Sequence, residues 1–129
     1  MDNKEKKILI VDDDDTSRSL VRQTLRDYQH VYEAADGVEA LAFLQRNPDT
    51  ALVFLDLMMP RMDGLELLVR LRLSPKFREM PIIMLSASPE DDINERAIRL
   101  GATKFAFKPY RMALLLQMAE ELLDQPRHE

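Results

Sequence analysis

The sequence predicts an α/β protein with a doubly wound parallel sheet, and three observations support this prediction. Short apolar runs and segments with the spacing of amphipathic helices alternate five times along the chain. The connections between them are short, so helical crossovers must join consecutive strands, which makes the strands parallel. The strands also read as continuous hydrophobic runs, as expected when helices cover both faces of a sheet.

The predicted elements follow a strict order of strand and then helix. The five strands are expected at residues 8–11, 30–34, 51–55, 81–85 and 104–107. Helical spacing follows the first, second, third and fifth of them at Leu20, Val21, Leu25 and Tyr28, at Val38, Leu41 and Leu44, at Leu65, Leu68 and Leu71, and at Leu114, Leu115, Met118 and Leu122. With five strands, the flavodoxin-like order 2-1-3-4-5 is expected, which places a crevice between the first and third strands.

The fourth helix, after the fourth strand, has the clearest end signals. Ser88 is expected as its N-cap and Pro89 as its first helical residue, with the acidic Asp91 three positions beyond the cap. Gly101 is expected to end this helix after Leu100.

Length, composition and charge narrow the class of protein. The 129 residues suffice for one hydrophobic core, so we expect a single domain over 1–129 with its core at about 6–124 and no output domain. There is no cysteine, which excludes disulfides and thiolate chemistry. No segment reads as a signal peptide or a membrane span, so the expected location is the cytoplasm. The net charge of -5 argues against direct binding to nucleic acid.

Polar residues follow four of the five predicted strands. Asp12 and Asp13 open an acidic run after the first strand, while Asp56, Ser86 and Lys108 follow the third, fourth and fifth. Taken singly, each has a structural explanation as a capping residue, a turn hydroxyl or a surface lysine. Because the carboxyl ends of parallel strands meet at one edge, the joint pattern predicts a site there.

Asp56 is the residue least compatible with a purely structural role, because it follows an apolar run that looks buried. If Asp12 and Asp13 lie nearby, the crowded carboxylates need a cation to stay ionised, and oxygen ligands of this density suit Mg²⁺. The ion would make phosphoryl transfer to a carboxylate feasible by neutralising charge on the phosphoryl oxygens. Lys108 would supply a second cation and Ser86 a hydroxyl donor.

Several motifs together resemble the signature of the response-regulator receiver domains of two-component systems. They are ILIVDD at 8–13, LDLMMP at 55–60 with MDG at 62–64, MLSA at 84–87 and KPY at 108–110. They occur in the order and at the spacing of that family, and the resemblance covers nearly the whole chain. The chain is similar to a single-domain receiver of the chemotaxis-regulator type.

The resemblance implies that Asp56 accepts a phosphoryl group from a histidine kinase or a histidine phosphotransfer protein. Asp12, Asp13 and Asp56 would hold Mg²⁺ together with the backbone carbonyl of Met58. Asp13 is expected to coordinate the ion directly and Asp12 through water. The chain would not be an enzyme, apart from taking the phosphoryl group from a donor and slowly losing it.

The resemblance also implies a switch and a partner face. Ser86 and Lys108 would contact the phosphoryl group, and displacement of Ser86 would leave space for Phe105 to turn inward. Phe105 stands where the family often has tyrosine, so the switch would work through burial of the ring alone. The expected face covers 92–99, 104–107 and 110–117, and its named residues are Ile93, Arg96, Lys104, Phe105, Tyr110 and Leu114. It would bind a downstream effector, a covalently linked output domain if the chain is a fragment, or a second phosphorylated copy, but neither nucleic acid nor a membrane.

Two alternatives stay open at this point. The pattern Asp12-x-Asp14-x-Thr16 matches the nucleophile motif of haloacid-dehalogenase-like phosphatases. That family also needs an acidic pair after a strand downstream of its lysine, whereas the acidic residues beyond Lys108 fall in the predicted last helix or at its end. The other alternative is a pseudo-receiver that binds a protein without being phosphorylated, although the residues that such a module would be expected to lose are all present.

Overall fold

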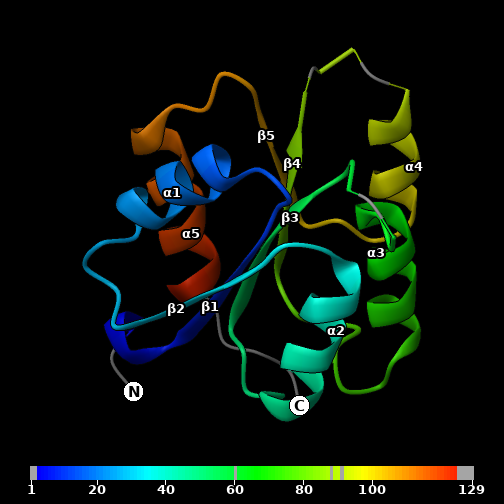
Figure 1. Cartoon of the computed structure of the whole chain (residues 1–129), viewed down its shortest axis with the longest axis horizontal. Helices are drawn as coiled ribbons and strands as arrows, with labels where there is room; N and C mark the ends of the chain where they lie inside the picture. Colours follow the sequence, from blue (N-terminus) through cyan, green and yellow to red (C-terminus); the bar gives the residue numbers. More distant parts are fainter. Residues whose placement is uncertain (1–2, 60, 88, 91, 125–129) are drawn as a thin grey trace.

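A computed structural model describes residues 3–59, 61–87, 89–90 and 92–124. Its centre is a five-stranded parallel sheet in the order β2-β1-β3-β4-β5, as predicted (Figure 1). The strands are β1 (Lys7–Val11), β2 (His30–Ala34), β3 (Leu52–Asp56), β4 (Ile82–Ser86) and β5 (Lys104–Phe107).

Helices cover both faces of this sheet, and α1 and α5 lie together on one side in Figure 1, with α2, α3 and α4 on the other. This is the arrangement expected when each parallel strand is followed by a crossover helix. The helices are α1 (Asp15–Thr24), α2 (Gly37–Arg46), α3 (Gly64–Leu73), α4 (Ile93–Arg99) and α5 (Met112–Asp124), preceded by the short 3₁₀ helix η1 (Asn3–Glu5). No helix in the described part of the chain is long and apolar enough to cross a membrane.

The core consists of two apolar layers, because successive residues of a strand point to opposite faces of the sheet. In β1, Ile8 and Ile10 face α1 and α5, whereas Leu9 and Val11 face α2, α3 and α4. Every residue of β3 and β4 is buried. The two layers fix the central strands and therefore the positions at which those strands end.

Three predicted strands differ from the structure by one residue, because β1 begins one residue earlier and β3 and β4 begin and end one residue later. Asp56 and Ser86 are the last residues of β3 and β4, whereas the sequence placed them just after those strands. The sheet pairing extends to them, since Asp56 pairs with Leu85 and Ser86 with Phe107.

The predicted start of the fourth helix is wrong, because α4 begins at Ile93 rather than at Pro89. Pro89 lies in a turn, while Ser88 and Asp91 lie outside the described residues. The N-cap position belongs to Asp92, whose side chain forms no capping hydrogen bond with the described residues. The predicted end is confirmed, because Leu100 is the C-cap and Gly101 has a φ of 106°.

Candidate functional site

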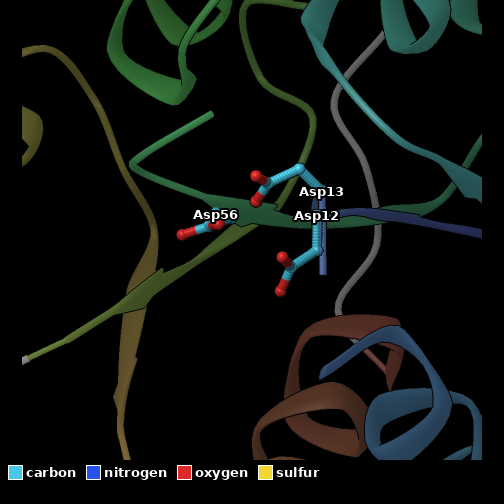
Figure 2. Close-up of side chains that lie close together, drawn as sticks. All are labelled: Asp12, Asp13 and Asp56. Carbon is cyan, nitrogen blue, oxygen red and sulfur yellow. The ribbon is translucent and has the colours of Figure 1, made fainter. Parts of the chain in front are cut away.

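Three carboxylates meet at the carboxyl ends of β1 and β3. The two strands are neighbours in which Val11 pairs with Leu55, so Asp12 and Asp56, the residues that follow, lie side by side. Asp13 adds a third carboxylate, and one oxygen atom from each of the three groups lies within 4.8 Å of the others. Figure 2 shows the three side chains at these strand ends. The structure therefore brings together the acidic residues that the sequence predicted.

Asp12 is almost completely buried and has an unsatisfied oxygen atom. Its Oδ1 accepts a hydrogen bond of 3.0 Å from the backbone N–H of Asp14. Its Oδ2 is buried and has no hydrogen-bond partner among the described residues. Burial raises the pKa of the Asp12 carboxyl. A buried, unpartnered carboxylate oxygen is costly unless a cation or a proton compensates it.

Asp56 is also buried, and its Oδ1 accepts a hydrogen bond of 3.3 Å from the backbone N–H of Met58. Burial, and next the negative charge of Asp12, raises the pKa of Asp56 to about 7. Near neutral pH this carboxyl therefore holds a proton for much of the time when no cation is near. A divalent cation can replace that proton, because it neutralises the same repulsion between the carboxylates.

Asp13 and Asp14 differ in what their carboxylates do, although both are exposed. The Asp13 carboxylate belongs to the acidic cluster. The Asp14 carboxylate caps α1, where it accepts hydrogen bonds from the backbone N–H groups of Thr16 and Ser17 and from the Ser17 hydroxyl at 2.9 Å. Its engagement with the helix speaks against the phosphatase reading, which needs Asp14 in the site.

The donor set fits a hard divalent cation such as Mg²⁺. All three side chains offer carboxylate oxygens, which are the ligands that Mg²⁺ prefers. The orphaned Oδ2 of Asp12 is a buried acceptor that such an ion, or a water molecule bound to it, would satisfy. Met58 lies two residues after the end of β3, and the use of its backbone carbonyl as a ligand stays a prediction.

Ser86 and Lys108 arrive at the same edge from the neighbouring strands. The backbone N–H of Lys108 donates to the carbonyl of Ser86 at 3.0 Å, which ties the end of β5 to the end of β4. The Ser86 side chain is buried, whereas Lys108 is exposed. Burial raises the pKa of both Asp12 and Asp56, and the positive charge of Lys108 opposes that rise. Lys108 is therefore close enough to act electrostatically on the acidic cluster.

Sequence reasoning missed Asn94, which contacts the site from α4. The Ser86 hydroxyl donates a hydrogen bond of 2.8 Å to Oδ1 of Asn94, and both side chains are buried. The available signal was a polar residue one turn before Ala97, on the side of the helix that faces the sheet.

Sequence reasoning also missed two contacts that hold the loop between β3 and α3, whose residues 57–59 and 61–63 we term the β3–α3 loop. Arg61 in this loop has a φ of 63°, and its Nε donates at 2.9 Å to the buried carboxylate of Asp36, the N-cap of α2. The N–H of Gly37 donates to the carbonyl of Met62 at 3.2 Å. The β3–α3 loop is thus held to the start of α2 at two points.

Phe105 and the predicted partner residues lie beyond this edge, on α4, β5 and α5 and, in the case of Tyr110, in the loop before α5. Phe105 is half-buried, and its ring stacks on that of Phe107 with centroids 5.9 Å apart. Leu114 and Arg96 are exposed, while Ile93 and Lys104 are partly buried. Tyr110 is not a simple surface residue, because its hydroxyl is buried and has no hydrogen-bond partner among the described residues. Burial raises the pKa of Tyr110.

Fold and site together define a class of protein, namely a doubly wound domain with an acidic cluster, a hydroxyl and a lysine at the carboxyl edge of its sheet. This is the architecture of a phospho-accepting receiver. Residues 8–120 match the response regulator receiver domain family, and the chain belongs to that family.

Relatives and solved structures agree with this assignment. The chain is 35% identical to the chemotaxis protein CheY homolog of Campylobacter jejuni over 91% of this chain and 92% of the relative. It is 35% identical to chemotaxis protein CheY1 of Helicobacter pylori over 91% and 96%. The structure of CheY4 of Vibrio cholerae has a TM-score of 0.84 at 32% identity, covering 92% of this chain and 98% of that one. The receiver domain of NtrX from Brucella abortus has a TM-score of 0.84 at 35% identity, over 93% and 100%.

The predicted family, fold and role are therefore confirmed. The chain is a phospho-accepting receiver of two-component signalling, and neither the phosphatase nor the pseudo-receiver is favoured. Receiver domains in general act as phospho-acceptors rather than as enzymes, bind Mg²⁺ at an acidic pocket, and interact with histidine kinases and downstream effectors.

Proposed function

We propose that Asp56 is the phosphoacceptor, and that Asp12, Asp13 and Asp56 hold Mg²⁺ together with the backbone carbonyl of Met58. The observation that carries the proposal is the cluster of three carboxylates, which includes one buried and unpartnered oxygen of Asp12. Asp13 is exposed and so can coordinate the ion directly, while the buried Asp12 acts through a bound water. The ion supplies neutralisation of the charge on the phosphoryl oxygens.

The reaction is a transfer from a phosphohistidine of a histidine kinase or a histidine phosphotransfer protein. An oxygen of the Asp56 carboxylate forms a bond to phosphorus, and the bond between phosphorus and the histidine nitrogen breaks, with its electron pair leaving on the imidazole. Asp56 must be ionised to attack. Burial and Asp12 raise the pKa of Asp56 to about 7, and a cation held by the cluster would favour the ionised form.

Ser86 and Lys108 receive the phosphoryl group after transfer. The Ser86 hydroxyl donates a hydrogen bond to a phosphoryl oxygen, and the Lys108 ammonium pairs with another. The backbone hydrogen bond between these residues supports this assignment, because it places both side chains at adjacent strand ends. Slow loss of the phosphoryl group to water returns the protein to its starting state.

The signal leaves through the face formed by α4, β5 and α5. Exposed apolar side chains on these elements support the proposal, since Ile98 is 59% exposed and Leu114 43% exposed. Phe105 turns inward when Ser86 is displaced, which changes the shape of the face. The partner is a downstream effector in the cytoplasm, an output domain linked to the chain, or a second phosphorylated copy.

Labelling with acetyl phosphate tests the acceptor. The protein is incubated with the donor with and without Mg²⁺, and the mass of the intact protein is measured together with that of Asp56→Asn. We expect a single phosphoryl adduct that needs Mg²⁺ and is absent from the variant. Persistent stoichiometric labelling of Asp56→Asn would place the acceptor elsewhere.

A further inference from the structure

A hydrogen bond joins the Ser86 hydroxyl to Asn94 on α4. Its length is 2.8 Å, and Ser86 and Asn94 are 2% and 6% exposed. A serine hydroxyl has one proton to donate, and in this structure that proton goes to the carboxamide oxygen of Asn94. The proposed reaction needs the same proton on a phosphoryl oxygen. The carboxamide and the phosphoryl group therefore compete for one donor.

Helix α4 is held to the sheet by few buried side chains. Its buried residues are Asn94 and Ala97, and the partly buried Ile93 also packs against the core. Helix α3 beside it buries five residues, among them Leu67, Leu68 and Leu71. Moving the Asn94 side chain therefore disturbs one of the few contacts between α4 and the core.

We propose that Asn94 is a positioning residue that holds the Ser86 hydroxyl in the unphosphorylated protein and transmits its displacement to α4. This inference rests on the proposed role of Asp56 as acceptor. When the hydroxyl turns to the phosphoryl group, the carboxamide of Asn94 loses that donor and adjusts, and α4 moves with it. Because α4 forms part of the proposed partner face, Asn94 links the acceptor site to that face. It also sets the cost of the switch, since the bond must break first.

The side-chain amide of Asn94 provides a direct test in the unaltered protein. Nuclear magnetic resonance records the side-chain amide signals before and after beryllofluoride is added with Mg²⁺. We expect the Asn94 signals and the backbone amides of 93–99 to shift. The side-chain amide of Asn47 is the matched control. Asn47 is the C-cap of α2, and its amide donates to the carbonyl of Phe43 and should stay in place. An Asn94 signal that remains unmoved when the acceptor is saturated overturns the proposal.

A double-mutant cycle separates positioning from general packing. In Asn94→Ala and Asn94→Leu the competing acceptor is gone, so beryllofluoride should bind about two- to tenfold tighter by calorimetric titration, the range expected for one hydrogen bond. In a Ser86→Ala background, either substitution should leave the affinity unchanged. The proposal is overturned if the Asn94 substitutions change the beryllofluoride affinity equally in both backgrounds. It is also overturned if they weaken binding when Ser86 is intact. Circular dichroism checks folding, and if both variants unfold, the amide signals of the unaltered protein decide.

The same titration distinguishes the inference from the function on which it rests. If the unaltered protein fails to bind beryllofluoride in the presence of Mg²⁺, the proposed acceptor site is wrong and the inference falls with it. If the unaltered protein binds and Asn94 neither shifts nor couples to Ser86, the acceptor site stands and the inference alone fails.

Discussion

Gly64, the first residue of α3, lies against the backbone carbonyl of Asp56 so closely that a β-carbon would overlap with it. Its N–H donates to the carbonyl of Leu57 at 3.1 Å, which joins α3 to the end of β3. Gly64→Ala must therefore displace either Asp56 or the helix. We expect a loss of about 1 to 3 kcal/mol in the free energy of unfolding, measured with urea, and weaker Mg²⁺ binding. Gly101→Ala is the control, because its positive φ makes it destabilising, while its place before β5, at the edge where the strands begin, spares Mg²⁺ binding. Equal metal affinities for Gly64→Ala and the parent would contradict the expectation.

The raised pKa of Asp56 predicts how stability depends on pH without metal. The carboxyl titrates near 3.8 when unperturbed and near 7 in the fold, so the folded state binds this proton more tightly. The stability that it contributes is complete below about pH 4 and is lost as the pH rises through about 7. Asp56→Asn removes this dependence and should be more stable than the parent by about 1 to 3 kcal/mol at about pH 8. Urea unfolding in chelator at several pH values measures it. If the stability of the parent rises from pH 5 to pH 8 relative to that of the variant, the fold does not raise the pKa of Asp56.

The two neighbours in the acidic run should differ in their effect on metal binding. Asp13 belongs to the cluster, whereas Asp14 caps α1. We expect Asp13→Ala to weaken Mg²⁺ binding about tenfold or more, and Asp14→Ala to lower thermal stability while sparing the metal. Calorimetric titration with Mg²⁺ and thermal unfolding separate the two effects. Equal losses of affinity would mean that Asp14 also faces the ion.

The contact between Arg61 and Asp36 should position the β3–α3 loop. Arg61→Gln removes the cation from a buried carboxylate, so the midpoint of urea unfolding should fall and Mg²⁺ should bind several-fold more weakly. Arg70→Gln is matched to it, since Arg70 pairs with Glu66 on the exposed side of α3 and should change neither quantity. If both variants behave alike, the loop does not need this contact.

Lys108 should be needed only after phosphorylation. Its side chain is exposed, so Lys108→Ala should retain the fold and, within about threefold, the Mg²⁺ affinity of the parent. In the variant, beryllofluoride should no longer shift the amides of α4 and β5. Chemical-shift mapping of parent and variant makes the comparison. Unfolding of the unphosphorylated variant would show that Lys108 has a structural role instead.

The sequence predicted the fold well because the signal was repeated along the whole chain. In a doubly wound sheet the central strands are buried on both faces, so apolar runs mark them, and the amphipathic spacing marks the helices. The predicted start of α4 was wrong for a physical reason. The segment from Ser88 to Asp91 resembles a helix start locally, but the structure has Pro89 in a turn, and the helix begins where Asn94 and Ala97 can pack against the sheet.

The site was predictable to the extent that it follows from topology. Asp12, Asp56 and Ser86 come at strand ends, and parallel strands end at one edge. The contacts of Asn94 with Ser86 and of Arg61 with Asp36 were not predictable in this way. Each joins polar side chains on different elements, and neither hydrophobic periodicity nor motif spacing indicates which polar side chains are in contact.

The proposed site draws one or more groups from each of four strands, from Asp12 near the start of the chain to Lys108 near its end. No partly folded segment can contain it. Binding of Mg²⁺ is consequently linked to folding of the entire sheet, and the ion should raise the melting temperature in proportion to the logarithm of its concentration once binding is saturated. The cellular supply of Mg²⁺ would then set both how readily the receiver accepts its signal and how long each molecule survives to receive one.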